Sequence, residues 1–223
     1  MSFTEDMQAR TAAIWRAAKE HPFLQQLVTD ELPHETFLYY IHQDAWFLRE
    51  EAKVLAIAAA RAGDLATTAR LSELISAVNA AEQNRHRSFA ERLGRPIDDA
   101  HHTPSPTAYA YVAHLRSVAL DAPLAPILAA LLPCPWLYCD FGRHFFDHEP
   151  ADPIYAEWLA AYKSELLDER VGFQRRLLDA EVEKADAPVR LAAERAFEIS
   201  IHYEFRFWEM AVAREEWPSG TVA

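Results

Sequence analysis

The sequence APLAPILAALLPCPWLYC, residues 122–139, is the longest stretch of the chain without a charged side chain. Its length is close to that of a membrane-spanning helix. It is interrupted, however, by Pro123, Pro126, Pro133 and Pro135, and no comparable segment occurs elsewhere. Proline removes a backbone donor and breaks the interior of a helix. We therefore predict a buried core helix that is broken at its prolines.

Helical patterns extend from this stretch toward both ends of the chain. Apolar residues recur at helical spacing, and breaks such as Gly63-Asp64 separate the helices. Ser105 followed by Pro106 is typical of a helix start, because serine caps the first turn and proline fits into it. The other expected elements are helices over residues 4–19, 23–28, 33–62, 65–93 and 106–120, a polar loop over 95–103, one or two helices over 154–182, and a last helix over 187–216.

We expect a single helical domain over residues 1–223. Apolar residues make up 51% of the chain, which is enough for one large core, and five glycines are few for a protein rich in hairpins. The sequence contains no alternating strand pattern, internal repeat or linker. The predicted fold class is all-α, with about seven or eight helices packed as a bundle.

Charge and the N-terminal residues bear on partners and location. The formal net charge of −12 disfavours binding to a phosphate backbone. The first residues, MSFTEDMQAR, lack the basic and apolar regions of a signal peptide, so we expect a cytoplasmic protein without a membrane partner. Cys134 and Cys139 are five residues apart and point in different directions on a helix, which predicts two reduced thiols and no disulfide bond.

Cys134 is a candidate for chemistry because a proline stands on each side of it. Pro135 disfavours the α conformation at Cys134, so a helix should kink or restart here. A thiol at the start of a helical turn lies near the positive end of the helix dipole, which favours the reactive thiolate. Tyr138, four residues on, shares the same face. The alternative is a buried, unreactive cysteine in an apolar helix, and the spacing alone does not choose between the two.

Two carboxylates lie among aromatic residues. Asp44 and Phe47 are three residues apart in YYIHQDAWFL and share a helix face. Asp44 is therefore either a ligand-binding acid or a solvated residue at the rim of an apolar stripe. Glu204, in IHYEFRFW, is surrounded by large apolar side chains, an environment that raises the pKa of a carboxyl group and suits general acid–base catalysis. The alternative for Glu204 is an ion pair with Arg206 or a distant arginine.

The ten histidines do not predict a metal site. Glu82 and His86 have the spacing of ligands on one helix, but a dinuclear carboxylate site needs a second such set. His144 and His148 share that spacing, yet the aromatic residues and the proline around them are typical of a helix end. We expect structural roles for these residues and neither a metal nor a cofactor.

Together these segments resemble the TenA family, whose members include thiaminase II, also called aminopyrimidine aminohydrolase. The resemblance covers nearly the whole chain, in the family's order and spacing. The motifs that carry it are HPF at 21–23, QD at 43–44, SPTAY at 105–109, LAALLPC at 128–134, WLY at 136–138, PIY at 153–155, Tyr162, and YEFRFW at 203–208.

The resemblance implies a haem-oxygenase-like fold and a homotetramer. It also implies a thiamine-salvage reaction in which water replaces an amino group. In that reaction 4-amino-5-aminomethyl-2-methylpyrimidine gives hydroxymethylpyrimidine and ammonia, and thiamine itself is cleaved in a slower side reaction. The family divides into members with and without an active-site cysteine, and Cys134 places this chain with the first group.

The resemblance also assigns roles to individual residues. Cys134 is expected to be the nucleophile that adds to the pyrimidine ring, and Glu204 to protonate the departing amine and then activate water. Asp44 is expected to accept hydrogen bonds from the amino edge of the ring, and Tyr138 to bond a ring nitrogen. The residues expected to line the pocket or stack on the ring are Phe47, Tyr111, Tyr162 and Phe207.

The chain departs from the family pattern at two of these positions. Phe47 stands where many cysteine-bearing members have tyrosine, so one hydroxyl near the site is missing. Pro135 stands where an aromatic residue often follows the cysteine. Neither departure removes a group that the reaction itself needs.

Two other functions are compatible with the same scaffold. One is an oxidase, either with two irons or without a cofactor, and the missing second ligand set is unfavourable to iron. The other is a binding or regulatory protein. The acidic charge and the lack of a basic recognition helix are unfavourable to direct DNA binding.

Overall fold

The computed structural model describes residues 1–77 and 84–218, and these residues form helices without any strand. The all-α prediction is confirmed for this part of the chain. The helices are α1 (Phe3–Arg10), α2 (Ala12–Lys19), α3 (Pro22–Val28), α4 (His34–Ala60), α5 (Leu65–Ala77), α6 (Asn84–Arg92), α7 (Pro106–Asp121), α8 (Leu124–Leu131), α9 (Pro133–His144), α10 (Pro153–Ala161), α11 (Glu165–Glu183) and α12 (Ala187–Ala213).

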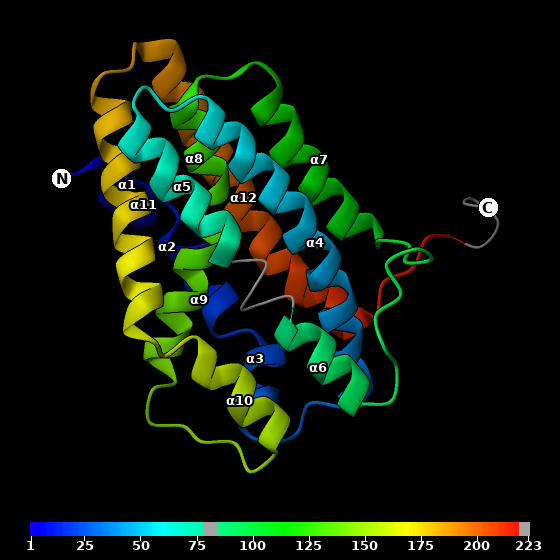
Figure 1. The fold of residues 1–223 in the computed structure, drawn as a ribbon. Coiled ribbons are helices and arrows are strands. Elements are labelled where there is room, and N and C mark those ends of the chain that lie inside the picture. The colour runs from blue at the N-terminus through cyan, green and yellow to red at the C-terminus, as the bar shows by residue number, and fades with distance from the viewer. Residues whose placement is uncertain (78–83, 219–223) are drawn as a thin grey trace.

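The uncharged stretch forms the centre of the bundle. Every residue of α8 is buried, and α8 packs most extensively against α12 (Figure 1). The segment Leu124–His144 is long and apolar enough to cross a membrane, but 83% of its most apolar window is buried inside the protein. The prediction of a buried core helix is confirmed.

The break predicted at the prolines falls at Leu132. α8 ends at Leu131 and α9 begins at Pro133, so Cys134 and Pro135 lie in the first turn of α9. Cys134 is helical although a proline follows it. The first N–H groups of a helix have no partner within that helix, so the two prolines remove no helical hydrogen bond here.

Two helices of 27 residues each, α4 and α12, run the length of the bundle (Figure 1). α5, α6 and α7 pack against α4, while α2, α7 and α9 pack against α12. α11 contacts both α8 and α9. Side chains from α4, α9, α11 and α12 are thereby brought toward a common interior.

Buried aromatic side chains set the positions of two tyrosines in this interior. The ring centroid of Trp208 lies 4.9 Å from that of Phe23, 5.4 Å from that of Tyr40 and 5.5 Å from that of Tyr138. Tyr40 is 0% exposed and Tyr138 7%. Rings packed this closely from several helices have little freedom, so the two hydroxyl groups are held in place.

The helix boundaries confirm part of the predicted pattern. The Ser105 hydroxyl accepts a hydrogen bond from the Ala108 N–H at 3.1 Å, and Pro106 is the first residue of α7, as predicted. The expected helix over 65–93 is helical on both flanks, α5 and α6, while its residues 78–83 lie outside the described part of the chain.

The prediction of seven or eight helices is wrong, because the described residues alone form twelve. The helix expected over 4–19 is divided at Thr11, whose hydroxyl donates to the Met7 carbonyl at 2.7 Å. Neither glycine nor proline marks that break. The last helix ends at Ala213 rather than at 216, because Arg214 adopts a left-handed conformation with φ of 48°.

Gly142 of α9 allows this helix to approach the end of α10 closely. A Cβ atom at position 142 would lie 2.1 Å from the carbonyl oxygen of Tyr162, far inside van der Waals contact. Gly172 of α11 differs, because the nearest atom to an added Cβ is Nη1 of Arg176 at 3.1 Å. That atom is the end of a flexible side chain.

We predict that Gly142→Ala lowers the free energy of unfolding by about 1–3 kcal/mol, since the backbone of Tyr162 must shift. The matched variant Gly172→Ala should instead raise it by up to about 1 kcal/mol, because alanine is the better helix former. Urea denaturation followed by circular dichroism measures both. Equal stability of the two variants would contradict the close approach at Gly142.

Candidate active site

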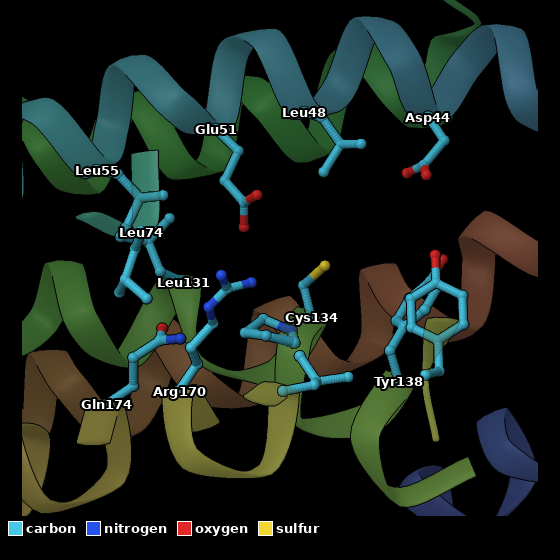
Figure 2. Close-up of a pocket in the computed structure, with 13 residues that line it drawn as sticks. Asp44, Leu48, Glu51, Leu55, Leu74, Leu131, Cys134, Tyr138, Arg170 and Gln174 are labelled. Atoms are coloured by element: carbon cyan, nitrogen blue, oxygen red, sulfur yellow. The ribbon is translucent and has the colours of Figure 1, made fainter. Parts of the chain in front are cut away.

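One face of α4 lines a cavity in the bundle. Asp44, Leu48, Glu51 and Leu55 follow one another at intervals of four, three and four residues, which places them on the same side of the helix. All four belong to the cavity wall and point into it (Figure 2). The wall therefore carries two carboxylates, Asp44 and Glu51, separated by a leucine.

The facing wall comes from several other helices. α9 contributes Cys134, Pro135 and Tyr138, and the sulfur of Cys134 points toward α4 (Figure 2). The predicted face shared by Cys134 and Tyr138 is confirmed, since both line the same cavity. The remaining described residues of the wall are Leu74, Leu131, Tyr162, Leu167, Arg170 and Gln174.

Asp44 is held by a group of buried polar side chains. The Tyr40 hydroxyl donates to Oδ2 of Asp44 at 3.1 Å and lies 3.0 Å from the Tyr138 hydroxyl. Nε2 of His86 lies 3.0 Å from the same Oδ2. Burial raises the pKa of Tyr40 and of Tyr138 well above the ordinary value, so both hydroxyls keep their protons. The carboxylate is thus fixed in direction, as recognition of a ligand requires.

Glu204 of α12 is buried beside this group, with 3% of its surface exposed. The Tyr111 hydroxyl donates to its Oε1 at 2.6 Å. Burial raises the pKa of Glu204 to about 8, and the negative charge of Asp44 acts in the same direction. Hydrogen bonds with Tyr111 and Cys134 oppose that rise. At neutral pH the carboxyl group therefore keeps its proton and can act as an acid.

The thiol of Cys134 is in hydrogen-bond contact with Glu204. Cys134 is half-buried in the first turn of α9, where the positive end of the helix dipole favours a thiolate. A thiol of the cavity wall and a buried carboxyl group that can exchange a proton are thus adjacent. The sequence left open an ion pair of Glu204 with Arg206. In the structure, Glu204 contacts Tyr111 and Cys134 instead.

Cys139 lies in a different environment from Cys134. It is 1% exposed, and its Sγ donates to Oδ1 of Asp168 at 2.7 Å. Burial and this hydrogen bond to a carboxylate raise the pKa of the Cys139 thiol to about 12. Neither cysteine takes part in a disulfide bond, as expected, and of the two only Cys134 belongs to the described cavity wall.

Three of the aromatic residues expected on the pocket wall form a buried cluster with one another. Phe47, Tyr111 and Phe207 are at most 4% exposed, and the ring of Phe47 lies 4.8 Å from that of Tyr111 and 5.7 Å from that of Phe207. Tyr111 also stacks on Tyr203 at 5.1 Å. These rings pack on one another, with Tyr111 beside Glu204, and their contact with a ligand stays a prediction. Tyr162 does line the cavity.

Sequence reasoning did not connect several polar residues with the site, among them His86, which it considered only as a metal ligand. Tyr40 and His86 contact Asp44, while Glu51 and Arg170 line the cavity. Tyr40, Asp44 and Glu51 are spaced so that they share one face of a helix, and this spacing could have indicated that Glu51 lies on the same side as Asp44. Nothing local connects Arg170 or His86 to α4, because they come from α11 and α6.

The histidine pairs do not gather into a metal centre. Within residues 1–77 and 84–218, no group of three His, Cys, Asp or Glu side chains is arranged to hold a metal ion. Glu82 lies outside the described residues, and its expected companion His86 faces Asp44. α9 ends at His144, which confirms the helix end predicted there.

Comparison with known proteins gives the family. The sequence profile of the TENA/THI-4/PQQC family matches residues 8–214. The chain belongs to this family. It is 36% identical over 223 residues to the aminopyrimidine aminohydrolase of Bacillus subtilis (strain 168), covering 100% of this chain and 94% of that protein. The aminopyrimidine aminohydrolase of Halalkalibacterium halodurans is 29% identical over 220 residues, which cover 97% of this chain and 98% of that protein.

Solved structures of TenA homologues share the fold. The homologue from P. horikoshii OT3 superposes with a TM-score of 0.84 at 27% identity, covering 95% of this chain and 98% of that one. The homologue from Pyrococcus furiosus superposes with a TM-score of 0.86 at 22% sequence identity, covering 94% of this chain and 99% of that one. A domain with a heme oxygenase-like fold from Shewanella denitrificans OS217 superposes with a TM-score of 0.71 at 13% sequence identity, covering 95% of this chain and 92% of that one. The predicted haem-oxygenase-like fold is confirmed.

We predict that Glu204 makes the stability of this TenA-family protein depend on pH. In the unfolded chain the carboxyl group ionises near 4.5, whereas in the folded protein it keeps its proton up to about pH 8. The folded state binds the extra proton between these values, so the free energy of unfolding falls as the pH rises through this window. Glu204→Gln cannot ionise and should gain stability relative to the wild type from pH 5 to pH 8.

Urea denaturation of both proteins at several pH values tests this prediction. The matched control is Glu73→Gln, whose side chain is 62% exposed on α5 and should not change the slope. Parallel stability profiles for Glu204→Gln and the wild type would contradict a carboxyl group that stays protonated at neutral pH.

Proposed function

We propose that the protein is a thiamine-salvage hydrolase, an aminopyrimidine aminohydrolase that converts 4-amino-5-aminomethyl-2-methylpyrimidine to hydroxymethylpyrimidine and ammonia, with thiaminase II as a side activity. Family membership and full-length similarity to relatives of that name support the proposal. At the level of residues it is supported by one arrangement. The Cys134 thiol contacts the buried Glu204 and lines the same cavity as Asp44, which comes from a helix far away in the sequence.

Asp44 and the tyrosines provide the recognition. The fixed Asp44 carboxylate accepts hydrogen bonds from the amino edge of the pyrimidine, and the Tyr138 hydroxyl bonds a ring nitrogen. Tyr162 packs against the ring from the cavity wall. The layer of Phe47, Tyr111 and Phe207 backs the ring on the side of Glu204. A flat aminopyrimidine thus meets an acidic acceptor at one edge and aromatic surfaces around it.

Cys134 and Glu204 perform the chemistry. The Cys134 thiolate bonds to a ring carbon, and the electron pair displaced into the ring expels the neutral amine from the methylene carbon as ammonia, with protonated Glu204 supplying the proton that the amine needs to leave. Glu204 then takes a proton from water, whose oxygen bonds to the methylene carbon. Breaking the carbon–sulfur bond restores the ring and the thiolate of Cys134, and Glu204 is protonated again. One water is consumed and one ammonia is released.

The two departures from the family pattern fit this scheme. Phe47 packs between Tyr111 and Phe207, so the apolar layer behind Glu204 is uninterrupted, which is consistent with the raised pKa of that carboxyl group. Pro135 lies on the cavity wall in the first turn of α9, where it removes no helical hydrogen bond.

We also propose a cytoplasmic homotetramer without nucleic-acid or membrane partners. The net charge of −12 is unfavourable to nucleic acid. Exposed large apolar side chains, including Leu65 at 82% and Leu120 at 69%, provide surface that association between subunits would bury.

We predict that the purified protein hydrolyses the aminomethylpyrimidine with a higher kcat/KM than thiamine. Cys134, Glu204, Asp44 and Tyr138 all act on the pyrimidine, and the smaller amine needs less room to leave. Steady-state assays of ammonia release and of thiamine loss measure the two values. A higher kcat/KM for thiamine, or no turnover of either compound, would contradict the proposed function.

We predict that Cys134→Ser lowers turnover by several orders of magnitude, because no other group replaces the sulfur in the covalent step. Product affinity should change much less, since Asp44 and the aromatic surfaces remain. Cys139→Ser is the matched control and should keep most activity. Iodoacetamide should alkylate Cys134 on the order of tenfold faster than Cys139, whose pKa is about 12. Near-normal turnover by Cys134→Ser would contradict the mechanism.

A further inference from the structure

The Tyr40 hydroxyl connects two side chains of the cavity wall that come from different helices. It donates to Oδ2 of Asp44 at 3.1 Å and lies 3.0 Å from the Tyr138 hydroxyl. Asp44 belongs to α4 and Tyr138 to α9, and the two enter the cavity from opposite sides (Figure 2). Tyr40 itself is 0% exposed and is not among the described residues of the wall. Its effect on a ligand would therefore pass through Asp44 and Tyr138.

The contacts of Asp44 with Tyr40 and His86 fall on the same carboxylate oxygen. The Tyr40 hydroxyl and Nε2 of His86 lie 3.1 Å and 3.0 Å from Oδ2. Because the Asp44 side chain points into the cavity (Figure 2), a carboxylate held at Oδ2 presents Oδ1 to a ligand. The hydroxyl of Tyr40 thus helps to decide how the acceptor is oriented.

The ring that carries this hydroxyl has little freedom to move. The ring centroids of Phe23, Trp158 and Trp208 lie 5.2, 5.8 and 5.4 Å from that of Tyr40. Burial raises the pKa of Tyr40 well above its ordinary value, so the hydroxyl keeps the proton that it donates. A donor on a fixed ring holds its partners in place before a ligand arrives, which lowers the entropy that binding must otherwise cost.

We propose that Tyr40 is a positioning residue for pyrimidine recognition, whose one hydroxyl holds Asp44 of α4 and Tyr138 of α9 in the arrangement that the ring binds. The inference rests on the proposed function, in which Asp44 accepts from the amino edge of the ring and Tyr138 bonds a ring nitrogen. The contact between Cys134 and Glu204 does not involve Tyr40. Tyr40 therefore contributes to affinity and not to the bond-making steps.

Tyr40→Phe in the full-length protein tests this proposal, because it removes the hydroxyl and keeps the packed ring. Calorimetric titration with hydroxymethylpyrimidine should show binding weakened by about tenfold, as two side chains must now be ordered by the ligand itself. The kcat for the aminomethylpyrimidine, measured at saturation, should stay within about threefold of the wild-type value.

Tyr155→Phe is the matched control. The Tyr155 side chain is 1% exposed, and its hydroxyl donates to the Leu32 carbonyl at 2.7 Å. Each variant loses one buried hydroxyl bond, so urea denaturation should show a loss of stability in both. Only Tyr40→Phe should lose affinity for the pyrimidine, whereas a merely structural role of Tyr40 predicts the same affinity for the two variants.

Each outcome bears on the proposal. Unchanged affinity in Tyr40→Phe, an equal loss of affinity in Tyr155→Phe, or a kcat that falls as far as the affinity overturns the role of Tyr40 while the proposed function stands. If the wild-type protein neither binds nor turns over these pyrimidines, the proposed function is wrong and the role of Tyr40 falls with it. Should Tyr40→Phe not fold, 4-fluorophenylalanine at position 40 fills the space of the hydroxyl without its donor, and the same two measurements decide the question.

Discussion

The Ser200 hydroxyl donates a buried 2.7 Å hydrogen bond to the Ala130 carbonyl and so ties α12 to α8 near the end of α8. Ser200 lies one helical turn before Glu204, and Ala130 lies four residues before Cys134. The contact sits within the most extensive helix–helix packing of the bundle. Because both partners are held in a close-packed core, the distance between the thiol and the carboxyl group is set by this packing.

Burial of acidic groups around one thiol governs the electrostatics of the site. Asp44, Glu51 and Glu204 are each at most 5% exposed. Ionisation of all three without compensation would be unfavourable in so little water. Asp44 accepts a hydrogen bond from the Tyr40 hydroxyl and lies beside His86, whereas Glu204 keeps its proton up to about pH 8. These different surroundings are consistent with the roles proposed for Asp44 in recognition and for Glu204 in proton transfer.

The aromatic cluster serves stability and function together. Trp208 packs on Tyr40 and Tyr138, whose hydroxyls lie 3.0 Å apart and connect to Asp44. Phe47 and Phe207 form an apolar layer with Tyr111, which donates to Glu204. These rings lie in the apolar surroundings of Glu204, whose burial raises the pKa of its carboxyl group.

The amino-acid sequence by itself determined the local features of this protein. Its apolar spacing, proline positions and caps predict the helices, the buried α8 and the helix start at Cys134, because these depend on neighbours within a few turns. Motifs in family order also gave Cys134, Glu204 and Asp44 as candidate site residues. A helix break without glycine or proline, such as the one at Thr11, could not be recognised from the sequence.

Only the tertiary structure decided which side chains meet. Glu204 is 70 residues from Cys134 in the numbering, and His86 reaches Asp44 from another helix. Helical periodicity states which face a residue occupies but not which helix packs against that face. The contact of Tyr111 with Glu204 and the place of Arg170 on the cavity wall depend on the packing of α7, α11 and α12 around α8. The energy of that packing is spread over the whole core.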